Sequence, residues 1–417
     1  MGPMELSPEI RRLSEKAMAD IEPAFKALDR LALENTEKVL SAFQKHRVSE
    51  ACLTGTTGYG YNDKGRDTLD LIYADVFGAE SALVRIGFVN GTHAITAALF
   101  GAMVTGDILL SATGTPYDTL RGAIGIEGDY RGSLRDYGVG YAQTDLMPDG
   151  TPDYDAVARA AADKRVAAVL VQRSSGYSAR SALTMPQIGK ICDIVHAAND
   201  RAAVIVDNCY GEFTGTTEPT QVGADLMAGS LIKNPGGGLA PTGGYVAGRK
   251  DLVEAAAYRL TSPGIGGECG ASLFNNRLLY QGFFMAPHTV SEALKTAIFC
   301  ARLLELMGYG TLPAWDATRS DIIQMVQLGD PELLQRFCRG IQAGAPVDAY
   351  VSPEPWDMPG YGCQVIMAAG TFVQGASIEL SADGPMRAPY CAYLQGGLTF
   401  EAGRLGIMTA ADMLRDK

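Results

Sequence analysis

The sequence has little of what marks a nucleic-acid-binding or membrane protein. Its 35 Lys and Arg residues are outnumbered by 47 Asp and Glu, which gives a formal net charge of −12. Such a charge excludes nucleic acid or an anionic membrane as a partner held by bulk electrostatics. No run approaches the roughly 18 apolar residues of a membrane span, and the first residues lack the apolar core of a signal peptide. We therefore expect a cytoplasmic protein with neither kind of partner.

Metal-binding patterns are missing as well. The eight cysteines are scattered singly, no Cys-x-x-Cys pair occurs, and the four histidines lie far apart in the sequence. Zinc sites are built from such pairs, and no cluster of carboxylates has plausible ligand spacing. We expect reduced thiols and no bound metal.

What is present predicts three consecutive segments. Residues 1–55 form an N-terminal helical segment, with Pro8 at the first helical position and Pro23 as an expected break. Residues 56–286 alternate helical periodicity with short apolar runs, which predicts a large domain with a mostly parallel sheet and helices on both faces. Residues 287–417 carry long helical stretches and Pro/Gly-rich loops, which indicates a smaller C-terminal α/β domain.

Two short apolar runs end in opposite charges. The first ends at Asp207, and the second ends at Lys233 and is followed by a glycine-rich stretch. Ligands of open α/β sheets bind at the carboxyl ends of strands. An amine and a carboxylate there suit pyridoxal 5'-phosphate (PLP), because the amine forms a Schiff base and the anion keeps the pyridine nitrogen protonated. We expect burial to lower the proton affinity of Lys233, making it a catalytic nucleophile and base.

Two further segments are suited to the cofactor phosphate. Ser230 precedes Lys233 by three positions, so its hydroxyl is placed to bind phosphate. Asn90, Gly91 and Thr92 precede a helical run over 94–103. The first backbone N–H groups of a helix, together with its dipole, form a cradle for an anion.

Three side chains near these segments have more than one interpretation. Tyr117 follows the next expected strand, where a tyrosine either stacks on the cofactor ring and acts as acid or base, or simply packs in a turn. His93 either stacks on the ring or caps the helix. Cys209 either lines the site or fills space as a small apolar residue.

These residues carry a family resemblance. Residues 206–210 and 223–233 resemble the cofactor motif of the Cys/Met-metabolism, fold-type I PLP enzymes. The match is closest to the methionine γ-lyase-like branch of aluminium-resistance proteins, whose further signatures match residues 58–67, 230–244, 282–288, 353–360 and 372–384. The resemblance covers nearly the whole chain and implies an aspartate aminotransferase-like fold with PLP as cofactor. It assigns Asp207 to the ring nitrogen, Lys233 to the Schiff base, Tyr117 to the ring face, and Ser230 with the Gly91-Thr92 backbone to the phosphate.

The resemblance also implies an assembly. Its members form homodimers or dimers of dimers, so this chain is expected to be a homodimer or homotetramer with active sites at the subunit interface. The loop that contains Tyr59, Tyr61 and Arg66 would then bind a neighbour's cofactor or substrate. For Arg66 the alternative is a solvated loop arginine.

The chain departs from the family pattern in places that border the expected site. Tyr393 stands where the wider superfamily has an arginine for the substrate carboxylate. Arg387 is our substitute, because a guanidinium binds a carboxylate through two hydrogen bonds; the alternative is a plain surface arginine. Within the closer branch we expect proline-glutamine in place of Ile86-Gly87, serine in place of Asn90, arginine in place of Ser175, tryptophan in place of Ala179 and proline in place of Ser181. These changes predict a reshaped pocket.

The expected reaction is γ-elimination from a small L-amino acid. Lys233 removes the Cα proton, and Tyr117 or Lys233 supplies a proton where one is needed. The leaving group is a thiolate from methionine, homocysteine or cystathionine, or a halide in a specialised member, where an unsaturated substrate yields an alkyne. The nearest alternative is β-elimination from cysteine or cystathionine. An aminotransferase and a PLP-binding protein without turnover remain open, whereas a P-loop is disfavoured because its glycines precede the lysine.

Overall fold

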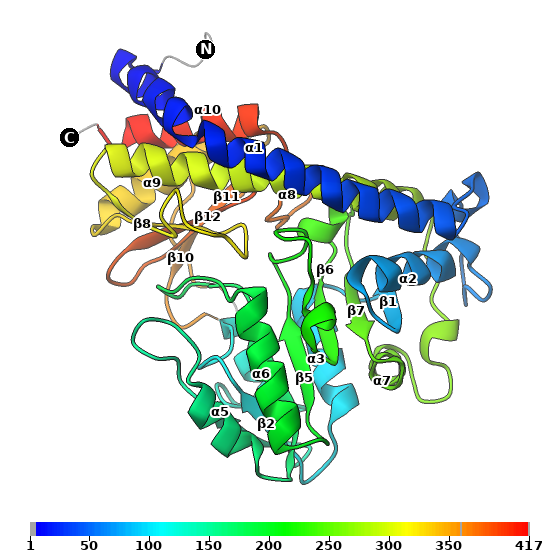
Figure 1. The fold of residues 1–417 in the computed structure, drawn as a ribbon. Coiled ribbons are helices and arrows are strands. Elements are labelled where there is room, and N and C mark those ends of the chain that lie inside the picture. Colours follow the sequence, from blue (N-terminus) through cyan, green and yellow to red (C-terminus); the bar gives the residue numbers. More distant parts are fainter. Residues whose placement is uncertain (1–5, 359–360, 416–417) are drawn as a thin grey trace.

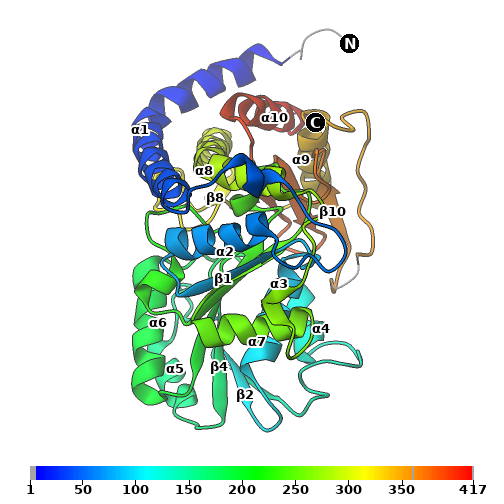
Figure 2. The ribbon, with the colours of Figure 1, turned by 90° about the vertical axis from the view of Figure 1, so that its right-hand side faces the viewer.

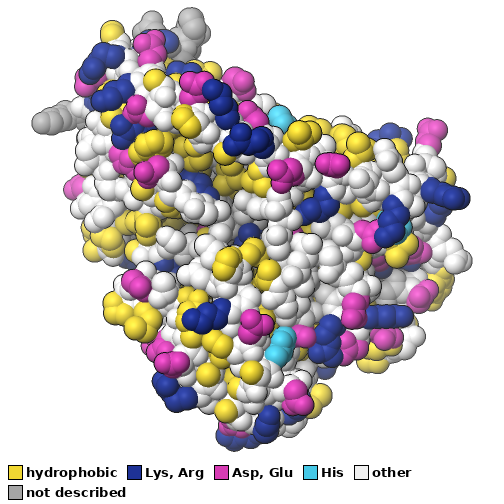
Figure 3. All heavy atoms as spheres, in the orientation of Figure 1, with side chains coloured by type: hydrophobic (Ala, Val, Ile, Leu, Met, Phe, Trp, Pro, Cys, Tyr) yellow, Lys and Arg dark blue, Asp and Glu magenta, His cyan; other side chains and the backbone are white. Residues whose placement is uncertain are grey.

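A computed structural model of the chain describes residues 6–358 and 361–415. Figure 1 shows a large domain in the lower part of the view, a C-terminal domain above it, and the long helix α1 (Pro8–Lys45) running across the top. None of the described helices is long and apolar enough to cross a membrane. Acidic and basic side chains are interspersed on the face shown in Figure 3.

The large domain is built on a seven-stranded sheet in the order β1-β7-β6-β5-β4-β2-β3. β7 is antiparallel to β1 and β6, and all other neighbours are parallel, which confirms the predicted mostly parallel sheet. The strands span β1 Ser81–Arg85, β2 Ile108–Ser111, β3 Gly140–Gln143, β4 Val166–Gln172, β5 Ala203–Asp207, β6 Leu226–Ser230 and β7 Gly244–Gly248.

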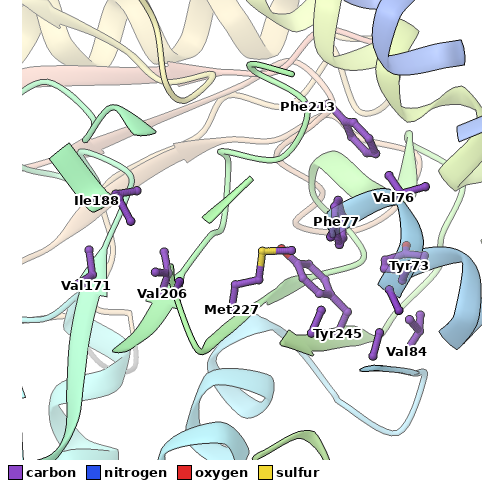
Figure 4. Packing of buried hydrophobic residues seen from close by; sticks show 14 of the residues in the cluster. Tyr73, Val76, Phe77, Val84, Val171, Ile188, Val206, Phe213, Met227 and Tyr245 are labelled. Carbon is purple, nitrogen blue, oxygen red and sulfur yellow. The ribbon is translucent and has the colours of Figure 1, made fainter. Parts of the chain in front are cut away.

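Helices cover both faces of this sheet, so alternate residues of the central strands enter two separate cores. Val204 and Val206 pack in one core with α2, α5, α6 and part of α8, whereas Ile205 packs in the other with α3, α4 and α7. Figure 4 shows the first core, where Met227 and Tyr245 face the aromatic side chains of α2. The helices span α2 Lys64–Phe77, α3 Gly91–Ala102, α4 Asp118–Ile124, α5 Tyr154–Ala161, α6 Met185–Ala198, α7 Lys250–Leu260 and α8 Asn276–Leu306. Short 3-10 turns span Glu50–Leu53, Pro219–Val222, Asn234–Gly236 and Gly266–Glu268.

The C-terminal domain has a five-stranded antiparallel sheet in the order β10-β11-β12-β9-β8. Its own core lies between this sheet and helices α8, α9 and α10. The elements span β8 Gly310–Leu312, β9 Gln324–Gln327, α9 Pro331–Ala343, β10 Val365–Ala368, β11 Ser381–Pro385, β12 Cys391–Gln395 and α10 Phe400–Met413.

Two long helices belong to both cores. α8 packs Phe283 in the large-domain core and Phe299 in the C-terminal core, so the expected boundary at residue 287 falls inside a continuous helix. α1 likewise divides its buried residues between the two. The predicted break at Pro23 is wrong, because α1 continues through it; Figure 2 shows instead that the helix changes direction along its length. A proline inside a helix removes one backbone hydrogen bond and bends the axis without ending the helix.

A buried polar network joins the loops that follow β4 and β5. Arg173, 1% exposed, donates from Nη1 to Asn208 Oδ1 (2.7 Å) and from Nη2 to Thr214 Oγ1 (3.0 Å). Its Nη1 also lies 3.3 Å from Oε2 of the buried Glu218. The network holds the backbone that follows Asp207.

We expect Arg173→Ala to lower the free energy of unfolding by about 3–5 kcal/mol, because it leaves the Glu218 carboxylate buried and uncompensated. Urea denaturation followed by circular dichroism measures the change. Arg165→Ala is the matched control: it removes an ion pair of 2.7 Å with Asp163, but the Arg165 side chain is 70% exposed. Its expected cost is below about 1 kcal/mol. Equal losses in the two variants would contradict the account.

Candidate active site

A cavity of about 240 Å³ lies where the carboxyl ends of β5 and β6 face the C-terminal domain. Every residue that the sequence analysis assigns to the cofactor lines it: Asn90, Gly91, Thr92, Tyr117, Asp207, Ser230 and Lys233. The other lining residues of the large domain include Thr119, Tyr177, Cys209 and Tyr210, and the C-terminal part contributes Tyr361, Met367, Ser377, Ser381, Asp383 and Gln395. The structure thus brings residues from distant parts of the sequence into one site.

The amine and the carboxylate meet at one end of this cavity. Asp207 ends β5, is 6% exposed, and accepts a hydrogen bond from the backbone N–H of Cys209 at 3.1 Å. Lys233 follows β6, and its Nζ lies 3.7 Å from the centroid of the Tyr210 ring. The sequence motif therefore places both groups at the carboxyl ends of neighbouring parallel strands.

The expectation that burial lowers the pKa of Lys233 is wrong for the protein by itself. Burial does lower the pKa of this amine, but Cys209, Tyr210 and Asp207 raise it, and the net direction is upward. Burial raises the pKa of the Cys209 thiol and of the Tyr210 phenol, so both keep their protons at neutral pH and Asp207 is the counterion that matters. Burial also raises the pKa of Asp207, while Lys233 lowers it.

The part of the cavity formed by the start of α3 is suited to phosphate. α3 begins at Gly91, and the Asn90 side chain caps it by accepting from the backbone N–H of His93 at 2.9 Å. Among the described residues, nothing accepts from the backbone N–H groups of Gly91 and Thr92, so both are free for an anion. The Thr92 hydroxyl lies 2.8 Å from that of Thr119.

His93 itself points elsewhere. Its Nδ1 accepts from the backbone N–H of Val89 at 3.2 Å, and its ring meets Phe88 edge-on. It does not line the cavity. Of the two interpretations, the structure favours the local role at the start of the helix.

Several tyrosines also line the cavity. The Tyr117 hydroxyl lies 2.9 Å from the Tyr361 hydroxyl, and the Tyr117 ring lies edge-on to Tyr177 with centroids 5.7 Å apart. Burial raises the pKa of the Tyr117 phenol well above its ordinary value. Tyr117 is therefore a proton donor at neutral pH, with its ring at the cavity surface.

These residues fit PLP on structural grounds. An amine that forms a Schiff base, a buried carboxylate for the ring nitrogen, and two free helix N–H groups for the phosphate lie in a single cavity. No group of three or more metal-ligating side chains occurs within residues 6–358 and 361–415.

The predicted substrate residues do not line this cavity. Tyr59 and Tyr61 are 75% and 55% exposed and stack on each other with centroids 5.7 Å apart. Arg66 is 4% exposed and donates to the backbone carbonyls of Gly60 (2.7 Å) and Gly270 (2.8 Å), so the alternative of a solvated loop arginine is wrong. Arg387 lies exposed on the turn between β11 and β12. Within one chain, Arg66 fixes the loop that carries the two tyrosines.

Both loops that depart from the family pattern contribute to the cavity. Asn90 lines it directly, and the loop with Ser175, Ala179 and Ser181 contributes Tyr177. Ser175 donates its backbone N–H (2.9 Å) and its hydroxyl (3.3 Å) to the buried carboxylate of Asp321. Ser175 thereby sets the course of this loop.

Sequence reasoning missed several lining residues. Tyr210 follows Asp207 by three positions, and this spacing was available as a signal. Asp383 and Gln395 lie on neighbouring antiparallel strands of the C-terminal sheet, far from the cofactor motif in the sequence. Nothing local in the sequence showed that these strands face Lys233.

The mostly parallel sheet with an antiparallel β7, the separate C-terminal domain and the Lys233–Asp207 pair define a fold-type I, PLP-dependent enzyme. A methionine gamma lyase from Micromonospora echinospora shares this fold, with a TM-score of 0.54 at 20% identity over 82% of this chain and 86% of that one. More specifically, the chain belongs to the methionine gamma-lyase family, whose model matches residues 10–415. This confirms the expected family, and with it PLP as the cofactor.

Close relatives cover nearly the whole chain. The uncharacterized protein YnbB of Bacillus subtilis (strain 168) is 52% identical over 409 residues, which are 98% of this chain and 97% of YnbB. A carbon-sulfur lyase involved in aluminum resistance from Clostridium novyi NT has a TM-score of 0.94 at 53% identity, covering 98% and 96% of the two chains. A candidate cystathionine beta-lyase involved in aluminum resistance from Clostridium acetobutylicum has a TM-score of 0.95 at 50% identity, with the same coverage. The chain is thus a PLP-dependent lyase of this family.

Proposed function

We propose that the enzyme catalyses γ-elimination from an L-amino acid that carries a leaving group on Cγ. The observation that supports this most is the presence of two separate proton-handling groups, Lys233 and Tyr117, in the cofactor cavity. β-Elimination requires one proton to be removed from carbon, whereas γ-elimination requires protons to be moved at both Cα and Cβ. A lysine amine and a phenol in one cavity suit the second requirement.

Each residue has a distinct task in this proposal. Bound PLP supplies an electron sink that acidifies the protons on Cα and Cβ of the substrate. The N–H groups of Gly91 and Thr92 hold the phosphate, and the Asp207 carboxylate keeps the ring nitrogen protonated. Lys233 Nζ takes the Cα proton and, once it has passed that proton on, the Cβ proton, and Tyr117 Oη gives a proton to the departing group.

The relatives and the changed loops each support a candidate leaving group. The name of the Clostridium novyi protein, a carbon-sulfur lyase, supports a thiolate. Asn90 at the cavity surface and the Ser175 loop keep a halide as the second candidate, with an alkyne product from an unsaturated substrate. The name of the Clostridium acetobutylicum protein supports β-elimination as the alternative reaction.

Product analysis of the purified holoenzyme tests the proposal. We expect homocysteine to give 2-oxobutanoate, ammonia and sulfide, with little pyruvate from cysteine. Pyruvate from cysteine and no 2-oxobutanoate from homocysteine would contradict γ-elimination and support β-elimination. Chloride released from a γ-chloro unsaturated amino acid, with no turnover of either thiol, would assign the halide.

Two further features belong to the same proposal. The exposed pair Tyr59 and Tyr61, on a loop fixed by the buried Arg66, supports a homodimer or homotetramer in which this loop faces a neighbour's cavity. All eight cysteines are unpaired, which supports a cytoplasmic location. Arg387 stays a candidate for the substrate carboxylate only through such an assembly.

A further inference from the structure

The cavity has two walls of different chemistry. All the residues assigned to the cofactor come from the large domain, whereas the facing wall comes from the C-terminal part of the chain. Among the described residues that line the cavity, the charged side chains are Asp207, Lys233 and Asp383, and none is an arginine or a histidine. The facing wall therefore carries one charge, and that charge is negative.

Asp383 is held firmly and keeps one oxygen available. It lies on β11 and is 7% exposed. Its Oδ2 accepts from the Tyr177 hydroxyl (2.8 Å) and from the Gln395 amide (2.8 Å). No described residue donates to Oδ1. A carboxylate oxygen that opens on a cavity and has no donor from the protein is free to accept a hydrogen bond from a ligand.

A neighbouring tyrosine fixes this arrangement. Tyr393 pairs with Asp383 across the two strands, and its hydroxyl donates to the backbone carbonyl of Tyr177 at 2.9 Å. The rings of Tyr177 and Tyr393 lie 5.1 Å apart between centroids. Tyr393 thus fixes Tyr177, and Tyr177 in turn fixes Oδ2 of Asp383. The position of the free Oδ1 is therefore set by the fold.

We propose that Asp383 determines which amino-acid side chains the cavity accepts. Its free Oδ1 binds a side chain that ends in a hydrogen-bond donor, above all a cationic one, and it disfavours a side chain that ends in an anion. This inference rests on the proposed function in that it takes an amino acid to be the ligand. A hydrogen bond to a charged group changes an affinity by about tenfold or more.

The charge state of Asp383 agrees with this role. Burial raises the pKa of its carboxyl to about 6, while the hydrogen bonds from Tyr177 and Gln395 and the charge of Lys233 act in the opposite direction. The carboxyl is therefore ionised at neutral pH. Five other acidic groups interact electrostatically with Asp383, and burial raises the pKa of each one. They therefore stay neutral near pH 6: Tyr117, Tyr177, Tyr210, Tyr361 and Cys338.

Three five-carbon amino acids without a leaving group on Cγ test the proposal: L-ornithine (cationic end), L-norvaline (neutral) and L-glutamate (anionic). Isothermal titration calorimetry on the holoenzyme at pH 7.5 gives their Kd values. We expect ornithine to bind at least about tenfold more tightly than norvaline, and glutamate to bind most weakly. Equal binding of ornithine and norvaline by the unaltered enzyme would overturn the proposal without any variant.

Variants locate the effect. Asp383→Asn should bring the Kd of ornithine to within about threefold of that of norvaline, and Asp383→Glu, which keeps the charge, should retain the preference. Asp107→Asn is the control, because Asp107 is a buried aspartate (5% exposed) that does not line the cavity. An equal loss of affinity for all three ligands in Asp383→Asn would show a merely structural role and overturn the proposal.

The pH dependence provides a second readout. The ratio of the norvaline Kd to the ornithine Kd should rise as the pH increases through the raised pKa of Asp383, because this carboxyl must lose its proton to attract the cation. Asp383→Asn should give a flat ratio. These three ligands have no leaving group on Cγ, so their binding does not depend on elimination. If their Kd values do not follow the expected order, only the role of Asp383 is contradicted. If the order holds but the enzyme catalyses no elimination, only the proposed function is contradicted.

Discussion

Lys233→Ala lowers kcat by about 10³-fold or more, because the variant loses both the amine that forms the covalent link to PLP and the base for the Cα proton. The visible absorption of the covalently linked cofactor disappears with it. Borohydride reduction and peptide mass spectrometry should find the cofactor on Lys233 in the unaltered enzyme and on no residue in the variant. Steady-state kinetics on homocysteine gives the loss of rate.

The chain offers a matched lysine as control. Lys190 Nζ lies 3.8 Å from the centroid of the Tyr154 ring, against 3.7 Å for Lys233 and Tyr210, but Lys190 does not line the cavity. Lys190→Ala should leave kcat and the absorption unchanged. Recovery of the cofactor adduct on a different lysine would refute the assignment of Lys233.

Asp207→Asn lowers kcat by about 10²-fold or more while the cofactor still attaches to Lys233. The amide has nearly the same shape as the carboxylate, but it cannot keep a pyridine nitrogen protonated, so the electron sink weakens. The same kinetics, with borohydride trapping to show that attachment is retained, separates loss of chemistry from loss of cofactor.

A second aspartate, at the amino ends of the same parallel strands, is the control for this variant. Asp225 precedes β6, and its carboxylate accepts from the backbone N–H of Val204 at 2.7 Å, at the amino end of β5. Asp225→Asn should change kcat by less than about threefold, whatever it does to stability. If Asp207→Asn and Asp225→Asn had equal kcat values, the role of Asp207 at the ring nitrogen would be excluded.

The sequence allowed the cofactor half of the site to be predicted because its signals are local. Asp207 and Lys233 each end an apolar run, and Gly91 opens a helix, so the rule that parallel strands end at one edge brings them together. The opposite wall could not be predicted this way. Asp383 and Gln395 lie on antiparallel strands whose cavity-facing side is decided by how the two domains pack, and no local pattern records that packing.

Two other features depend in the same way on how distant segments pack. A composition change near Pro287 suggested a domain boundary, yet α8 continues through it because its apolar residues serve two cores in succession. The pKa of Lys233 was expected to fall on burial, but Cys209, Tyr210 and Asp207 together raise it. In both cases a local rule was outweighed by a partner distant in the sequence.

Cystathionine distinguishes γ-elimination from β-elimination within a single molecule, because it carries sulfur on Cβ of one half and on Cγ of the other. Mass spectrometry of the products formed by the purified holoenzyme, with Lys233→Ala as the blank, identifies which bond breaks. We expect cysteine, 2-oxobutanoate and ammonia from cleavage at Cγ. Homocysteine, pyruvate and ammonia would show cleavage at Cβ and contradict it.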